Sequence, residues 1–236
     1  MLQLKKLSVS VGKKQILNNF NFEFEKGKIY AVMGPNGSGK STLAFSIMAH
    51  PTYILNKEAR IMKNGKRIDD LTADKRAHEG IFMSFQSPMS LSGVSIHQLL
   101  QLALSGEKDP LTIRNETEKY AKELKISEEL LSRSLNEGAS GGEKKKLEVL
   151  QAAVLDKDVM IFDEIDTGVD VDALRTISKF LDKHKKGKTY IIITHYNRIL
   201  HYLKPDKVLV LVKGKLMKTG DHRLAKKIEK EGYKDY

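Results

Sequence analysis

The sequence predicts an α/β fold in which an inserted helical subdomain interrupts a mainly parallel sheet. Strand-sized apolar segments alternate with helical ones in both halves of the 236-residue chain, which is typical of parallel sheets covered by helices. Between residues 95 and 151 the pattern is helical and contains no convincing strand. These two observations indicate one α/β core, formed by both ends of the chain, with a helical insertion.

The first elements follow from periodicity. Residues 2–9 and 19–25 alternate apolar and polar side chains, which predicts two strands. Residues 28–33 form an apolar run that ends at a glycine-rich turn, and this predicts a buried strand. A helix should follow from about residue 40 to residue 49.

The remaining elements need turn signals as well as periodicity. Asn64-Gly65 between two short polar–apolar segments predicts a hairpin. Residues 80–85 predict a buried strand that ends near Gln86. After the helical stretch, apolar runs predict further strands at 159–162, 189–194 and 207–212.

Composition restricts the classes of protein. The 41 basic and 30 acidic residues leave a formal charge of +11, which permits phosphate ligands, nucleic acid or an acidic partner. The chain has no cysteine, so it can hold neither a disulfide nor an iron–sulfur cluster on its own thiolates. No apolar run approaches the roughly 18 residues of a membrane span, and no signal peptide is evident. We therefore expect a cytoplasmic protein without direct membrane insertion.

A phosphate-binding loop follows the strand at 28–33. The residues GPNGSGKS match the pattern G-x-x-x-x-G-K-[ST] between a predicted strand and a predicted helix, which is the context the motif requires. Backbone N–H groups and the helix N-terminus would surround the phosphates of ATP, Lys40 would reach the β- and γ-phosphates, and Ser41 would ligate Mg²⁺. The predicted nucleotide ligands are Gly34, Pro35, Asn36, Gly37, Ser38, Gly39, Lys40, Ser41 and Thr42.

Two acids end the strand at 159–162. Asp163 would lie at the carboxyl edge of the sheet, where α/β proteins bind ligands, and would hold Mg²⁺. Glu164 would orient or deprotonate the attacking water. Gln86 and His195 each follow another strand, which makes Gln86 a candidate sensor of Mg²⁺ or water and His195 a candidate contact for the γ-phosphate.

The sequence SGGE at 140–143 precedes a predicted helix and offers a second anion site from backbone N–H groups and a hydroxyl. One nucleotide seldom needs two such sites in one chain. Two chains arranged head to tail would use both, with the phosphate loop of one facing the serine–glycine segment of the other.

In this order and spacing, the motifs resemble those of the ATP-binding cassette ATPases over essentially the whole chain. The resemblance implies Walker A at 34–41, Walker B at Asp163, a catalytic base at Glu164, a Q-loop at Gln86 and a switch histidine at His195. The signature Ser140, Gly141 and Gly142 would bind the γ-phosphate in trans, and Asp170 would form the D-loop. It also implies one domain, 1–236, with an antiparallel β subdomain. Residues 1–86 and 152–236 would form the catalytic core, and 87–151 the helical subdomain.

Two positions depart from the family pattern. The signature ends in Glu143 instead of glutamine, which places an acid near a phosphate, and Lys144 to Lys146 either offset that repulsion or form a solvated helix face. Val11 occupies the region of the aromatic residue that usually stacks on adenine, a contact that can contribute roughly 1–3 kcal/mol.

Within the family, the chain resembles the ATPase subunits of the SUF iron–sulfur cluster assembly machinery, through IDTGVD at 165–170, THYNRIL at 194–200 and the KEGYKDY ending. That resemblance implies SufB-type scaffold partners, and SufD-type partners where present, docking between about Ser87 and Leu104. The docking segment could instead cap the subdomain's own core.

Two alternatives remain at this stage. A transporter subunit would have the same ATP chemistry and a membrane protein as partner. A nucleic-acid-associated ATPase is suggested by the charge of +11, but the chain lacks the long coiled coils, zinc-binding cysteines or tandem cassettes typical of that class.

Overall fold

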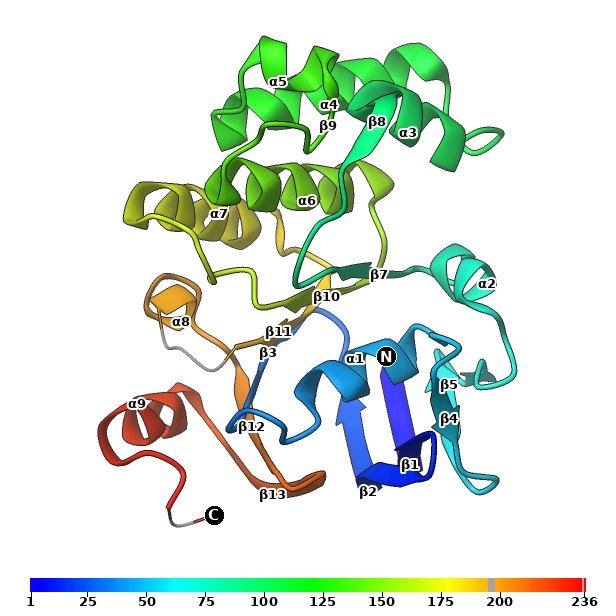
Figure 1. Cartoon of the computed structure of the whole chain (residues 1–236), viewed down its shortest axis with the longest axis vertical. Coiled ribbons are helices and arrows are strands. Elements are labelled where there is room, and N and C mark those ends of the chain that lie inside the picture. The colour runs from blue at the N-terminus through cyan, green and yellow to red at the C-terminus, as the bar shows by residue number, and fades with distance from the viewer. Residues whose placement is uncertain (195–197, 235) are drawn as a thin grey trace.

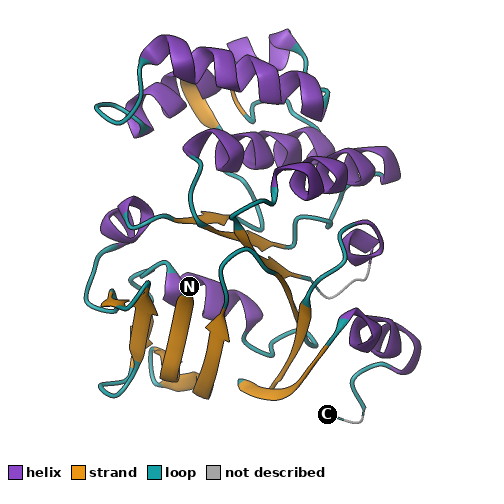
Figure 2. Cartoon of the chain, turned by 180° about the vertical axis from the view of Figure 1, so that it is seen from behind, coloured by secondary structure: helices purple, strands orange, loops and turns teal. Residues whose placement is uncertain are grey.

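The computed structural model describes residues 1–194, 198–234 and 236. Figures 1 and 2 show a twisted sheet across the middle of the molecule, with helices α6 and α7 on one face. Helix α1 lies on the opposite face, beside a second sheet that contains the N-terminal strands. Helices α3, α4 and α5 lie beyond α6, at the far end of the molecule from the N-terminal strands.

The central sheet has six strands in the order β13-β12-β3-β11-β10-β7. Its pairs are parallel except for the β12–β13 hairpin, as the alternation of strands and helices predicts. The strands are β3 (Ile29–Met33), β7 (Ile81–Ser84), β10 (Val159–Asp163), β11 (Thr189–Ile193), β12 (Lys207–Val212) and β13 (Lys215–Gly220).

The second sheet is antiparallel. It contains β1 (Leu2–Val11), β2 (Lys14–Phe24), β4 (Tyr53–Leu55), β5 (Arg60–Lys63) and β6 (Lys66–Arg67). The predicted hairpin is confirmed: Lys63 pairs with Lys66, and Asn64 and Gly65 both have positive φ, at 50° and 82°. Two consecutive positive φ angles are what a tight hairpin turn requires.

The described helices are α1 (Lys40–Ile47), α2 (Ala73–His78), α3 (Ile96–Ala103), α4 (Pro110–Leu124), α5 (Glu128–Ser132), α6 (Gly141–Leu155), α7 (Val171–His184), α8 (Arg198–Tyr202) and α9 (His222–Glu231). In the described part of the chain, none of them is both long and apolar enough to cross a bilayer. The expectation of no strand within 95–151 is wrong at one place. Strand β9 (Ser134–Leu135) pairs with β8 (Leu91–Ser95), because Leu135 is buried opposite Leu91.

Strand β3 shows how the sheet joins two cores. Ile29, Ala31 and Met33 pack in a core with α6 and α7, whereas Tyr30 and Val32 pack in a core with α1 and the antiparallel sheet. Successive side chains of a strand point to opposite faces, so a strand between two cores must be apolar at every position. This arrangement holds the carboxyl end of β3, and the loop that follows it, at a fixed place in the sheet.

Candidate functional site

The loop after β3 has the backbone that a phosphate site needs. At Gly34, a Cβ would lie 2.1 Å from the carbonyl oxygen of Leu211, so only glycine fits there. Gly39 has a φ of 102° and precedes α1, whose first turn has no side-chain cap. The first N–H groups of a helix lack intrahelical partners, and together with the helix dipole they attract anions. The described loop therefore presents donors to a phosphate group.

Lys40 is folded back over this loop. Its Nζ donates hydrogen bonds to the carbonyl oxygens of Gly34, at 2.8 Å, and Pro35, at 3.0 Å. Burial lowers the pKa of Lys40, while the nearby Glu164 and Asp163 carboxylates act against that shift. The ammonium thus lies between the loop carbonyls and the two acids, where a phosphate group would find a cation already in place.

Asp163 is the last residue of β10 and is fully buried. Neither of its carboxylate oxygens accepts a well-formed hydrogen bond from a described residue, although the Ser41 hydroxyl lies nearby, and its N–H donates to Ser84 Oγ at 3.2 Å. Burial and the Glu164 carboxylate raise the pKa of Asp163, whereas the Ser41 hydroxyl and the Lys145 and Lys40 ammonium groups oppose that shift. A buried carboxylate without a partner is costly, and a bound cation would supply the partner. The residues present therefore fit Mg²⁺.

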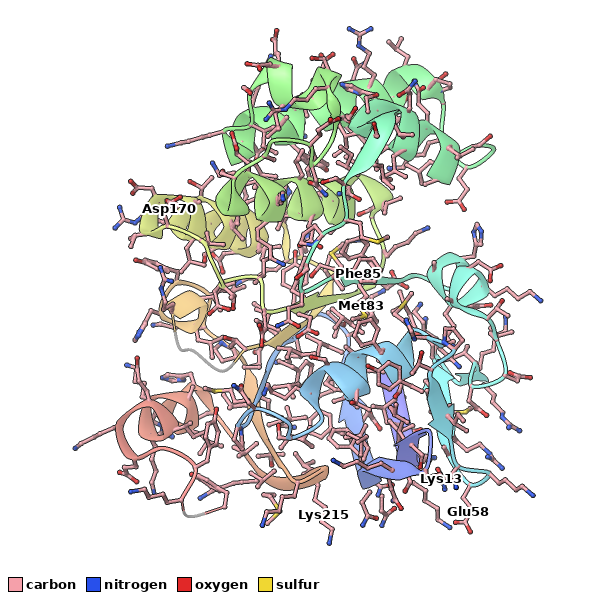
Figure 3. The ribbon with its side chains drawn as sticks, viewed as in Figure 1. Lys13, Glu58, Met83, Phe85, Asp170 and Lys215 are labelled. Carbon is pink, nitrogen blue, oxygen red and sulfur yellow. The ribbon has the colours of Figure 1, made fainter. Side chains whose placement is uncertain are left out.

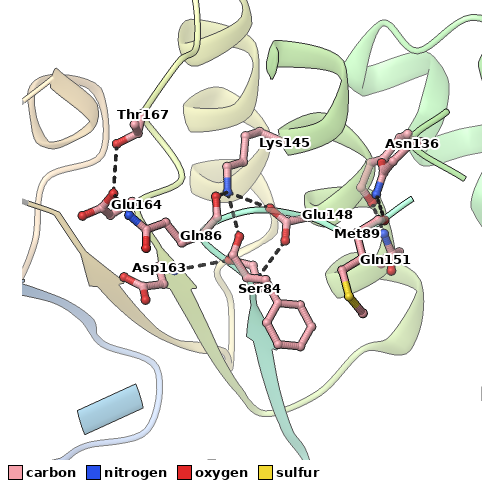
Figure 4. A network of polar contacts seen from close by, with 12 residues as sticks. Ser84, Gln86, Met89, Asn136, Lys145, Glu148, Gln151, Asp163, Glu164 and Thr167 are labelled. Atoms are coloured by element: carbon pink, nitrogen blue, oxygen red, sulfur yellow. Dashed lines mark hydrogen bonds and ion pairs between the residues drawn. The ribbon is translucent and has the colours of Figure 1, made fainter. Parts of the chain in front are cut away.

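Glu164 follows directly and has a left-handed backbone, with φ at 52°, which is unusual for a residue other than glycine. Its N–H donates to the carbonyl oxygen of Ile193 at 2.9 Å, which ties it to the end of β11. Gln86 Nε2 donates to Glu164 Oε2 at 2.7 Å (Figure 4). Because an ionised carboxylate only accepts hydrogen bonds, the amide nitrogen of Gln86 must face it. The amide oxygen then remains available for another ligand.

The signature segment lies elsewhere. Ser140 caps α6: its Oγ accepts from the N–H of Glu143 at 3.3 Å, and its own N–H donates to Glu143 Oε2 at 2.8 Å. The acid that departs from the family pattern is thus half of a capping box. That backbone hydrogen bond lowers the pKa of Glu143, which favours the charged form.

The D-loop residue Asp170 adjoins this segment. It caps α7 by accepting from the N–H of Ala173 at 2.8 Å, and a Cβ on Gly142 would lie 3.3 Å from its Oδ2. Figure 3 shows Asp170 at one end of α7. The six-stranded sheet separates α6 and α7 from α1 (Figure 1), so the helix that begins at the signature segment and the helix that follows the phosphate loop cover opposite faces of that sheet.

The phosphate loop follows β3 and the two acids lie at the end of β10, with only β11 between these parallel strands, so both lie at the same edge of the sheet. The model of the ABC transporter family matches residues 17–167. The chain belongs to the ABC transporter family, among its ATP-binding ATPases. A relative from Escherichia coli, the probable ATP-dependent transporter SufC, is 42% identical over 99% of this chain and 97% of its own length. The probable ATP-dependent transporter ycf16 of Antithamnion is 40% identical over 100% of this chain and 97% of its own.

Solved ABC cassettes share the fold. A nucleotide-free ATP-binding cassette from an ABC transporter has a TM-score of 0.78 at 25% identity, over 94% of this chain and 91% of its own. The dimeric structure of a bacterial ABC transporter cassette has a TM-score of 0.81 at 21% identity, over 94% and 99%. The predicted fold class is therefore confirmed, and the chain is an ATPase of this family that binds ATP.

In this ABC ATPase, several of the predicted site residues meet. Gln86 contacts Glu164, and Lys40 lies near Glu164 and Asp163, whereas Ser140 and Asp170 cap α6 and α7. His195 falls outside the described residues. For Lys145, the interpretation as a solvated helix face is wrong: the side chain is buried and donates to the carbonyl oxygens of Phe85 and Gln86.

Sequence reasoning missed two residues that hold this site. Glu148 accepts from the N–H of Phe85 at 2.8 Å, and Ser84 supports Asp163. A buried Glu on an amphipathic helix is the one signal that could have drawn attention to Glu148, since a carboxylate is rarely buried without a partner. The identity of that partner could not be read from the helix.

Replacing Asp163 by Asn should stabilise the nucleotide-free protein at pH 7 by about 1–3 kcal/mol, because a buried carboxylate loses its charge. In the native state its pKa is raised above the ordinary value of 3.8, so wild-type stability falls as pH rises through the interval between the two values. The variant lacks that fall. Urea denaturation of both proteins from pH 4 to pH 8 should therefore give a difference that grows with pH, and a constant difference would contradict the prediction.

Proposed function

We propose that this chain is the ATP-hydrolysing subunit of an iron–sulfur cluster assembly complex, in which ATP-dependent dimerisation reshapes bound scaffold proteins. The ATP-hydrolysing activity in this proposal is supported by one observation: Gln86 contacts Glu164, next to the Asp163 carboxylate, whose oxygens accept no well-formed hydrogen bond from the described residues. The biological half rests on the resemblance to SufC, which extends over nearly the full length of both chains.

In this proposal, the loop N–H groups and Lys40 hold the phosphates of ATP. Ser41, Asp163 and the amide oxygen of Gln86 would hold Mg²⁺, whose charge when bound offsets negative charge on the phosphates. Glu164 takes the proton of the attacking water. Its carboxylate accepts hydrogen bonds from Gln86 and, at 3.5 Å, from the Thr167 hydroxyl, while its N–H donates to the carbonyl oxygen of Ile193. His195 would contact the γ-phosphate.

The second half of the nucleotide site would come from another copy. Ser140, Gly141 and Gly142 begin α6, which covers the opposite face of the sheet from α1, the helix that follows the phosphate loop. Two copies arranged head to tail would pair each loop with the partner's signature segment, with Asp170 next to the junction. The small residues at 141 and 142 let the partner's phosphate approach the N-terminus of α6, which is where a helix attracts an anion.

We infer that scaffold proteins of the SufB and SufD type dock in a groove between the sheet and the helical subdomain. The groove has a volume of about 210 Å³, and its mainly apolar lining includes Phe85, Pro88, Met89 and Leu99. Phe85 is 48% exposed and Met89 is 70% exposed. Large apolar side chains left in water beside a groove are typical of a surface that binds another protein. Figure 3 shows Phe85 where the helical subdomain meets the sheet.

Purification of tagged Glu164→Gln from its native cells, with ATP and Mg²⁺, tests the proposal. Slow hydrolysis should retain the closed dimer together with its partners, which mass spectrometry would identify. Met89→Glu, made in the same background, should lose the partners while still binding ATP. Recovery of soluble SufB-type or SufD-type proteins is the expected result. Recovery of an integral membrane protein would instead indicate a transporter subunit, as the names of the relatives suggest.

A further inference from the structure

The chain that leaves β7 is held by two side chains of α6. Glu148 Oε1 accepts from the N–H of Phe85 at 2.8 Å. Lys145 Nζ donates to the carbonyl oxygen of Phe85 at 2.8 Å and to that of Gln86 at 3.1 Å. The same ammonium lies 3.0 Å from Glu148 Oε2. We call Lys145 and Glu148 the α6 clamp, and Figure 4 shows it at the centre of the polar network.

The α6 clamp is a fully satisfied polar pair inside the protein. The two side chains are only 4% and 6% exposed. An ammonium has three donors, and those of Lys145 are matched by two carbonyl oxygens and one carboxylate oxygen. A buried ion pair is often no more stabilising than apolar side chains of similar volume. A contribution to stability therefore does not explain why a buried ion pair is present here. Its contacts with the main chain of two consecutive residues, Phe85 and Gln86, offer a better explanation.

One of these two residues, Gln86, contacts the proposed catalytic acid Glu164. Gln86, whose carbonyl oxygen Lys145 holds, reaches Glu164 with its side chain at 2.7 Å. A further hydrogen bond holds the same segment three residues later, where Asn136 Nδ2 donates to the carbonyl oxygen of Met89 at 2.8 Å. A continuous set of contacts therefore leads from α6, which begins at the signature segment, to Glu164.

We propose that Lys145 and Glu148 are positioning residues for ATP hydrolysis, which place Gln86 against Glu164 and pass any displacement of α6 to that carboxylate. Glu148 also lines the docking groove with Phe85 and Met89, so a protein bound there acts on the same pair. The inference rests on the proposed role of Glu164 as the base.

The decisive variant is the double substitution Lys145→Met with Glu148→Leu. Removing both charges avoids leaving either one buried alone, so the double variant should regain part of the stability that Lys145→Met alone loses; the carbonyl oxygens of Phe85 and Gln86 lack the Lys145 donor in both variants. Its kcat should stay about 10-fold to 100-fold below wild type, because a misplaced group lowers the rate even when the fold is intact. The Kd for ATP measured without Mg²⁺, where the proposed Gln86 ligand plays no part, should change less than about 2-fold, because the hydrogen bonds of the clamp go to Phe85, to Gln86 or within the pair.

Lys63→Met is the matched control. Lys63 is also buried, at 5% exposure, and pairs with Asp158 at 2.8 Å, away from Gln86. This variant should lose stability while keeping its kcat. Hydrogen exchange in a peptide covering residues 82–90 supplies a readout that does not depend on activity. Exchange there should speed up in the double variant and stay unchanged in Lys63→Met and in Glu164→Gln.

Each outcome decides between roles. If kcat recovers together with stability in the double variant, the clamp is merely structural and the proposal is overturned. Unchanged exchange at 82–90 would also overturn it, since the clamp would then not hold this segment. Wild-type turnover in Glu164→Gln is a different failure: it removes the proposed base, whatever the clamp variants do.

Discussion

Replacing Glu164 by Gln should lower kcat for ATP hydrolysis about 10²-fold to 10⁴-fold, the usual contribution of a positioned general base. The amide cannot accept the proton of the attacking water. It has nearly the same shape as the carboxylate and can still accept a hydrogen bond from Gln86, so the local geometry should persist. The Kd for ATP should change little, because the phosphates are held by the loop after β3. Single-turnover hydrolysis and equilibrium binding of ATP measure the two quantities separately.

Glu129→Gln is a suitable control for this prediction, because it makes the same chemical change on a side chain that is 83% exposed and far from the site. It should leave both quantities unchanged. If Glu164→Gln hydrolyses ATP at the wild-type rate, another group must be the base. A parallel loss of ATP binding would instead mean that Glu164 supports the nucleotide site and not the chemical step alone.

Replacing Arg76 by Met should lower the free energy of unfolding by about 3–5 kcal/mol, because it removes the donors of a buried polar network. Arg76 is 1% exposed and comes from α2. Its Nη1 donates to the carbonyl oxygens of Ser46 and Ile47, at 2.9 Å and 2.8 Å, in the last turn of α1. Burial lowers the pKa of Arg76 to about 10. Met fills similar space but leaves the Ile47 carbonyl without the Arg76 donor and the Ser46 carbonyl with only the N–H of Ala49, at 3.3 Å.

The measurement is urea denaturation at neutral pH, with Arg114→Met as the control. Arg114 pairs with Glu118 on the surface of α4, with its side chain 67% exposed, and its loss should change stability far less. Equal midpoints for the two variants would mean that the last carbonyl groups of α1 find other partners. Since α1 begins at Lys40, Arg76→Met should also weaken ATP binding, whereas Arg114→Met should not.

The local elements of this fold could be predicted because their signals are local. Strand β3, the glycine-rich loop and α1 form one continuous stretch, in which an apolar run, glycines and a lysine follow one another. Asp163 and Glu164 were recognisable because they follow an apolar run directly. Boundaries were less accurate: β2 begins at Lys14, five residues before the predicted start, because its pairing with β1 extends to Val11.

The contacts between distant residues could not be predicted in the same way. Lys145 belongs to a run of three lysines, and nothing in that run distinguishes the buried one from its neighbours. Its environment depends on how α6 lies against the chain leaving β7, some 60 residues earlier. Arg76 presents the same problem, since its partners at the end of α1 are about 30 residues away. A helical pattern predicts which residues share a face but not what that face meets.

The sequence by itself thus determined the family, the phosphate loop, the two acids and the serine–glycine segment, because each is a short pattern whose chemistry follows from its own residues. The tertiary structure alone decided that Gln86 contacts Glu164, that the buried Asp163 carboxylate has no well-formed hydrogen bond among the described residues, and that α6 and α1 cover opposite faces of the sheet. These depend on the order of strands in the sheet and on which helices cover each face. Such an arrangement arises from burying apolar surface across the whole chain, so no single segment contains it.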